Sequence, residues 1–113
     1  MVKRKNIDEK VSASIMRFAT RVKAIGFPIH TVILFGSWAR GLQNKDSDID
    51  ICLVSPEFGK DEIEELQLLI KQTRDIDDRL EPVPISLSDY ISDATPLILE
   101  IKKHGLEFPT RPQ

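Results

Sequence analysis

Residues 31–54 read TVILFGSWARGLQNKDSDIDICLV, and this stretch decides the fold. It begins with a β-branched and aromatic run, residues 31–35, which is too short for a helix and predicts a buried strand. Gly36 and Ser37 end the run, and the residues that follow predict a short helical turn capped by Ser37. A polar loop then leads into a second predicted strand, residues 48–54, which has the apolar content of a central strand once its two aspartates are set aside.

Hydrophobic spacing predicts helices on both sides of this stretch. Apolar residues at steps of three or four indicate a helix over residues 8–25, ended by Gly26. Further helices are predicted over residues 61–74 and over residues 96–104, the last with a proline at its start and Gly105 at its end. The face of the 61–74 helix that is expected to cover a sheet consists of Ile63, Leu66, Leu69 and Ile70.

Residues 79–87 predict a third extended segment. Its prolines, Pro82 and Pro84, are two residues apart, so both missing N–H groups fall on the same edge of the strand. That edge cannot pair fully, and the strand is therefore expected to border the sheet. Three strands with helices between and around them predict a small α/β or α+β sandwich.

Length and composition limit the possible classes of protein. A chain of 113 residues with 41% apolar and 30% charged residues predicts one globular domain over residues 1–113. The net charge of −2, with both signs mixed along the chain, argues against a long nucleic-acid substrate. The longest apolar run is far shorter than the roughly 20 residues that cross a membrane, and no signal-peptide pattern is seen, so a cytoplasmic protein is expected. The single cysteine, Cys52, is predicted to be a buried, reduced thiol.

Two aspartates and a tight turn suggest chemistry on nucleotides. Asp48 and Asp50 are two residues apart on a predicted strand, so their side chains share a face, with α-carbons about 6.6 Å apart. Paired carboxylates at that separation can bind hard cations such as Mg²⁺. The Gly36–Ser37 turn offers backbone N–H groups and a hydroxyl to phosphate, and Arg40 lies where it could steady a triphosphate. Side by side, the two features predict metal-assisted nucleotidyl transfer.

The same residues resemble the signature of the minimal nucleotidyltransferase family, relatives of kanamycin nucleotidyltransferase and DNA polymerase beta. That signature is Gly-Ser, ten residues, then Asp-x-Asp, and ten residues separate Ser37 from Asp48 here. The resemblance implies a small mixed sheet packed with helices, with Mg²⁺ held by Asp48 and Asp50. It also implies transfer of a nucleoside monophosphate from a nucleoside triphosphate, with release of pyrophosphate.

Family members carry a third carboxylate on a following strand, which acts as a base or as a further metal ligand. Glu81 is the candidate, because it shares a predicted strand face with Val83 and Ile85. Glutamate stands where the family pattern often has aspartate. Asp77 and Asp78 are nearby rivals, expected on a helix end or a turn.

The resemblance also suggests an acceptor. Larger nucleotidyltransferases have extra domains that hold the acceptor, whereas minimal ones are commonly paired with a small helical HEPN-domain protein. They neutralise this toxin as antitoxins, in some cases by adding AMP from ATP to it. Two alternatives stay open: a binding module that neutralises its partner by contact alone, and transfer to a small molecule. The sequence leaves open a homo-oligomer.

Other interpretations of these residues are weaker. Asp46, Asp48, Asp50 and Glu57 match positions of an EF-hand calcium loop, but Ile51 stands where that loop needs glycine. Trp38 is expected to be a packing residue rather than a platform for a base. The two histidines have no partners at zinc-ligand spacing.

Overall fold

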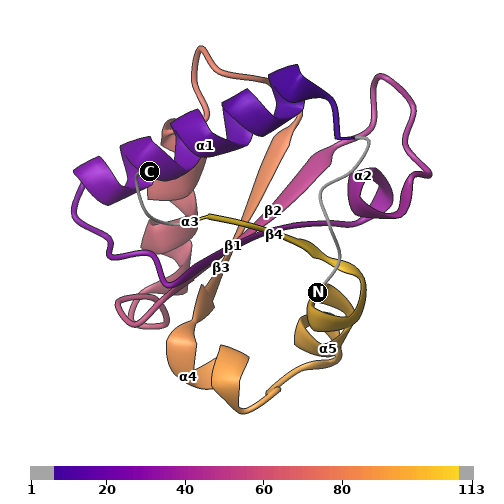
Figure 1. The fold of residues 1–113 in the computed structure, drawn as a ribbon. Helices are drawn as coiled ribbons and strands as arrows, with labels where there is room; N and C mark the ends of the chain where they lie inside the picture. Colours follow the sequence, from indigo (N-terminus) through magenta and orange to yellow (C-terminus); the bar gives the residue numbers. More distant parts are fainter. Residues whose placement is uncertain (1–6, 110–113) are drawn as a thin grey trace.

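Four strands form one mixed sheet in the computed structural model, which describes residues 7–109 (Figure 1). They are β1 (Thr31–Phe35), β2 (Ile49–Ser55), β3 (Leu80–Ser86) and β4 (Leu106–Phe108), in the order β3-β2-β1-β4. β1 pairs antiparallel with β2 and β4, whereas β2 and β3 are parallel. The α+β class and the mixed sheet are confirmed. β4 was not predicted, because three residues are too few to show a period of two.

Five helices surround the sheet within the described residues. α1 and α3 lie on one side, and α4 and α5 lie on the other (Figure 1). α4 was not predicted, because Ser86 ends β3 and at once caps this helix by accepting a hydrogen bond from the Asp89 N–H at 3.2 Å. None of these helices is long and apolar enough to cross a membrane. The helices are α1 (Glu9–Ala24), α2 (Ser37–Arg40), α3 (Glu62–Lys71), α4 (Leu87–Ile91) and α5 (Pro96–His104).

The larger core lies between the sheet and α1. The α1 residues that the spacing predicted to face inward, such as Ile15 and Phe18, are fully buried. They pack on alternate residues of β1 and β2, including Leu34 and Ile51. Because strand side chains alternate between faces, the residues between these point to the opposite side of the sheet.

The smaller core on that opposite side is covered by α5. Ile33, Cys52 and Ile85 pack there against Ile98 and Ile101. Burial raises the pKa of the Cys52 thiol to about 12, so this cysteine is the buried, unreactive thiol that was predicted. The apolar run at the start of α5 is only partly buried. Successive helical residues are 100° apart, and the run's other two members, Leu97 and Leu99, face outward.

Most of the apolar residues of α3 face solvent instead of the sheet, which was not predicted. Of its predicted sheet-covering residues only Leu69 is fully buried, and the other three are exposed. Glu65 takes an inward position instead, where its carboxylate accepts hydrogen bonds from the backbone N–H groups of Gly59, Lys60 and Asp61 at 2.9 to 3.1 Å. Burial alone would raise the pKa of Glu65, but these bonds outweigh it and lower the pKa. The hydrogen bonds from the loop before α3 to Glu65 therefore set the rotation of α3 about its own axis. Hydrophobic spacing alone could not predict this rotation.

The border position of β3 is confirmed. It pairs with β2 on one side, and no other strand in the described part of the chain pairs with its outer edge. Pro82 and Pro84 therefore remove two N–H groups from an edge that would otherwise be open to strand addition.

Candidate active site

The predicted carboxylates come together at one end of the sheet. Asp50 lies on β2 directly opposite Glu81 on β3 and Phe35 on β1. Asp48 lies just before β2, two residues from Asp50. Asp50 is half-buried, whereas Asp48 and Glu81 are exposed. Burial raises the pKa of Asp50, and the negative charges of Asp48 and Glu81 raise it further.

This arrangement fits a site for Mg²⁺ that the substrate completes. Among residues 7–109, no three acidic, histidine or cysteine side chains are arranged to enclose a metal ion by themselves. Mg²⁺ seldom needs such a cage, because one or two carboxylates, substrate phosphates and water are its usual ligands. Three carboxylates close enough to raise the pKa of one of them supply hard oxygen ligands and an excess of negative charge. Asp48 and Asp50 would hold the ion, with Glu81 beside them.

The EF-hand alternative is excluded by the course of the chain. β2 continues without a break from Ile49 through Ile51 to Ser55, so no calcium loop forms there. Asp48 lies just before one end of β2 and Glu57 lies after the other end, so their carboxylates are too far apart to bind one ion.

The Gly36 turn touches Asp50. Gly36 has φ +73° and ψ −152°, a conformation that residues with a side chain rarely adopt. A Cβ atom at this position would overlap the Asp50 carboxylate and lie 3.2 Å from its Cγ. Glycine is therefore needed twice, for the turn and for the close approach. The predicted juxtaposition of turn and carboxylate is present.

Ser37 does not cap α2 as predicted. The N-cap is Gly36, whose carbonyl accepts hydrogen bonds from the N–H groups of Ala39 and Arg40 at 3.2 and 3.3 Å. Ser37 is instead the first helical residue, where its N–H has no acceptor within the helix. Because α2 has only four residues, its dipole is small, and direct hydrogen bonds must supply most of the affinity for phosphate.

Arg40 lies beside a carboxylate of α5. Its Nη1 is 3.6 Å from the Glu100 carboxylate, and both side chains are about half exposed. An exposed pair at this distance stabilises little, so a triphosphate can compete for the guanidinium. The role of Arg40 in binding the triphosphate stays a prediction.

Trp38 holds the loop that leads to Asp48. Its side chain is 9% exposed in the larger core, which confirms a packing role. Its indole N–H donates a hydrogen bond to the Ser47 carbonyl at 3.0 Å. The guanidinium of Arg79 lies over the indole ring, 5.2 Å from its centroid, within the range of a cation–π interaction.

Arg79 fastens the same loop from the other side. It donates to the Asp77 carboxylate through Nη2 at 2.7 Å and Nε at 3.0 Å, and through Nη1 to the Lys45 carbonyl at 2.9 Å. Its own carbonyl accepts from the Ile49 N–H at 2.7 Å. The backbone is thus held at residues 45, 47 and 49, and Asp48 lies between the last two. This role was not predicted, because in the sequence Arg79 is only the first residue of the extended segment predicted over residues 79–87.

These contacts separate Asp77 from the candidate metal ligands. Hydrogen bonds from the Arg79 guanidinium lower the pKa of Asp77 and keep its carboxylate ionised. Both oxygens of that carboxylate accept from Arg79, so Asp77 has a structural partner, whereas Glu81 is the carboxylate in register with Asp50.

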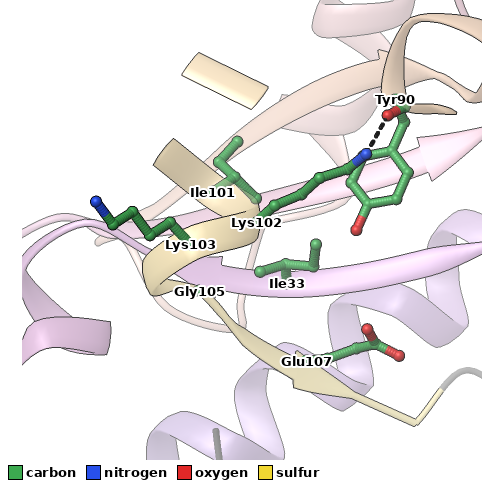
Figure 2. A pocket seen from close by; sticks show the side chains of 7 residues that line it. All are labelled: Ile33, Tyr90, Ile101, Lys102, Lys103, Gly105 and Glu107. Carbon is green, nitrogen blue, oxygen red and sulfur yellow. Dashed lines mark hydrogen bonds between the residues drawn. The ribbon is translucent and has the colours of Figure 1, made fainter. Parts of the chain in front are cut away.

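A separate hollow of about 360 Å³ lies under α5, on the side of the sheet to which Asp50 also points (Figure 2). It is not the candidate active site, because none of the three carboxylates lines it. Lys102 crosses it and donates hydrogen bonds to the Tyr90 carbonyl and to Asp93, both at 2.5 Å. The amine is therefore already neutralised within the protein.

The raised pKa of Asp50 predicts that this site lowers the stability of the metal-free protein. Ionised Asp50 is disfavoured in the folded state, so its contribution to stability falls as pH rises from the ordinary value of 3.8 through the raised pKa. Without Mg²⁺, we expect Asp50→Asn to be more stable than wild type at pH 7 by roughly 0.2–1 kcal/mol. This is the usual effect of removing repulsion between like charges that face each other on neighbouring strands. The difference should shrink toward pH 4.

Thermal unfolding in a chelator at several pH values measures this difference. Adding Mg²⁺ should then stabilise wild type but not Asp50→Asn, since binding to the folded state alone raises stability. An Asp50→Asn protein that is less stable than wild type at pH 7 would contradict the expected repulsion.

Comparison with known proteins agrees with the fold and identifies the family. The model of the nucleotidyltransferase domain family matches residues 15–107, and the chain belongs to this family. The crystal structure of a candidate nucleotidyltransferase from Sulfolobus solfataricus, at 1.40 Å resolution, has a TM-score of 0.57 and 19% sequence identity. The similarity covers 96% of this chain and 93% of that one, and at this identity it shows a shared fold. No match to a curated protein was found.

Proposed function

We propose that this protein transfers AMP from ATP to a hydroxyl group of a partner protein in a reaction that depends on Mg²⁺. The observation that carries the proposal is the contact between the Gly36 turn and Asp50, which has the charges of Asp48 and Glu81 beside it. A triphosphate needs donors for its oxygens and a cation for its charge, and this contact puts a donor turn next to cation ligands.

Each group has a task in this reaction. The N–H and hydroxyl of Ser37 donate hydrogen bonds to phosphate oxygens, and Asp48 and Asp50 hold the metal ion. These two carboxylates would hold Mg²⁺, which would supply charge neutralisation to the triphosphate and polarisation of the phosphoryl group. The acceptor oxygen forms a bond to the α-phosphorus, the bond from that phosphorus to the bridging oxygen breaks, and pyrophosphate leaves. Glu81 accepts the proton of the acceptor hydroxyl.

The proposed acceptor is a small helical HEPN-domain protein that this protein neutralises as an antitoxin in the cytoplasm. Two observations support a macromolecular acceptor. Asp48 and Glu81 are exposed, so a protein surface can reach them. Residues 7–109 consist of the sheet and the helices that pack on it, with no second lobe over the carboxylates. A protein acceptor would not need such a lobe, because its own fold would position the hydroxyl at the site.

Labelled ATP tests the proposal directly. The protein, Mg²⁺ and a HEPN-domain protein from the same genome are mixed, and mass spectrometry measures an added AMP on the HEPN protein. We expect labelling with wild type and its loss with Asp48→Asn. If neither protein labels the partner, the proposed acceptor is wrong. If neutralisation of the partner also survives Asp48→Asn, inhibition by contact alone replaces it.

A further inference from the structure

A carboxylate on α5, Glu100, lies beside the candidate active site and takes no part in the proposed chemistry. α5 packs on the side of the sheet to which Asp50 points, because Asp50 precedes a residue of the smaller core by two positions on β2. Phe35, which lies opposite Asp50 on β1, packs against the same core. α5 therefore borders the site, and Glu100 is a negative charge on this border.

Glu100 lies between two side chains that can carry positive charge. Its Oε2 is 3.6 Å from Nη1 of Arg40 on α2 and 3.9 Å from Nε2 of His104, which follows it by one turn of α5. The three side chains are between 35% and 51% exposed. Both contacts are long for hydrogen bonds and open to water, so either partner can be exchanged for another at little cost.

Arg40 is also placed to bind phosphate at the Gly36 turn. Its backbone N–H donates a hydrogen bond to the Gly36 carbonyl at 3.3 Å, so its backbone is one helical turn away from the proposed phosphate donors. A guanidinium can bind two phosphate oxygens at once. Glu100 opposes this binding in two ways, because it offers the guanidinium another partner and because its own negative charge repels phosphate.

We propose that Glu100 competes with phosphate for Arg40 and thereby promotes the release of pyrophosphate after each transfer. The inference rests on the proposed function, because pyrophosphate must form at this site. Arg40 would bind the phosphates of the substrate and of the product alike, and such uniform binding does not lower the barrier of the chemical step. Glu100 takes the guanidinium back as pyrophosphate leaves, and His104 stays beside Glu100 while Arg40 binds phosphate.

Binding of inorganic pyrophosphate in the presence of Mg²⁺ tests this inference without ATP or an acceptor. Calorimetric titration at low ionic strength compares wild type, Glu100→Gln, Arg40→Gln and the double variant. We expect Glu100→Gln to bind pyrophosphate about three- to ten-fold more tightly, because a competitor and a repelling charge are lost. Arg40→Gln should bind about ten-fold more weakly or worse. In that background Glu100→Gln should gain much less, because the group for which it competes is gone.

Two further variants show whether the effect comes from the charge of Glu100. Glu100→Asp keeps the carboxylate and should bind pyrophosphate with an affinity closer to wild type than to Glu100→Gln. Glu62→Gln removes the same charge from the start of α3, on the other side of the sheet, and should bind like wild type (Figure 1). A purely structural role of Glu100 predicts the opposite sign, because a disturbed α5 would weaken binding.

The outcomes separate this inference from the proposed function. Unchanged or weaker pyrophosphate binding by Glu100→Gln overturns the inference and leaves the proposed function standing. If wild type and every variant bind no pyrophosphate, the phosphate site itself is absent and both proposals are wrong. Failure to label a HEPN-domain protein does not alter the binding result, so the acceptor can be wrong while the inference holds. During turnover, Glu100→Gln should lower the KM for ATP and strengthen product inhibition by pyrophosphate.

Discussion

Replacing Asp50 with asparagine should lower the rate of nucleotidyl transfer by at least about a thousand-fold. Metal-ion stabilisation of a phosphoryl transition state contributes several kcal/mol, and about 4 kcal/mol corresponds to a factor of a thousand in rate. Asp50 is the proposed metal ligand whose carboxylate lies in contact with the Gly36 turn, so its loss separates the ion from the triphosphate. Pyrophosphate release with an acceptor that wild type uses measures the change.

Asp46→Asn is the matched control for this variant. Asp46 lies in the loop before β2, is exposed, and undergoes the same chemical change. It should stay within a few-fold of wild type. A rate for Asp50→Asn within ten-fold of wild type, in protein that is folded, would show that Asp50 does not hold the metal ion.

The arrangement of the candidate site residues was predictable from the sequence because they are close together along the chain. Asp48 and Asp50 are two residues apart, and the Gly36 turn ends a run whose strand character is plain from its β-branched residues. Antiparallel pairing of β1 with β2 then brings the turn to Asp50, since only α2 and one loop join the two strands. Spacing within one segment therefore carried most of the geometry.

The parts that could not be predicted depend on contacts between distant residues. The rotation of α3 follows from Glu65 satisfying three backbone N–H groups of the preceding loop, and hydrophobic spacing contains no information on that. The pairing of β4 with β1 follows from the position to which α5 returns the chain. Gly105 fits there because a Cβ atom would overlap Ile33.

The contacts of Arg79 were missed for the same reason, and they lead to the second large effect. Asp48 lies outside any strand, so sheet hydrogen bonds do not fix its backbone directly. Its position depends on the neighbouring backbone groups that Trp38 and Arg79 hold. We expect Arg79→Ala to lower Mg²⁺ affinity and transfer rate by about 10–100-fold, the usual effect of removing a group that orients a metal ligand.

Two readouts separate positioning of Asp48 from a general loss of stability. Trp38 is the single tryptophan of the chain, so its fluorescence reports the loop, and its emission should shift to longer wavelength in Arg79→Ala as water reaches the indole. Calorimetric titration with Mg²⁺ measures the affinity. Arg79→Lys should fall between wild type and alanine, because an ammonium group keeps the charge but cannot bind the Asp77 carboxylate in two places and the Lys45 carbonyl at once.

Arg17→Ala provides the control, because Arg17 is exposed on α1 and its loss removes the same side chain without touching the loop. It should leave the fluorescence, the Mg²⁺ affinity and the rate unchanged. If Arg79→Ala lowers the unfolding temperature but keeps wild-type Mg²⁺ affinity, Asp48 is held by other contacts and Arg79 stabilises the fold alone. If affinity and fluorescence change together, the hydrogen bonds of a residue outside the signature determine where the first aspartate of that signature lies.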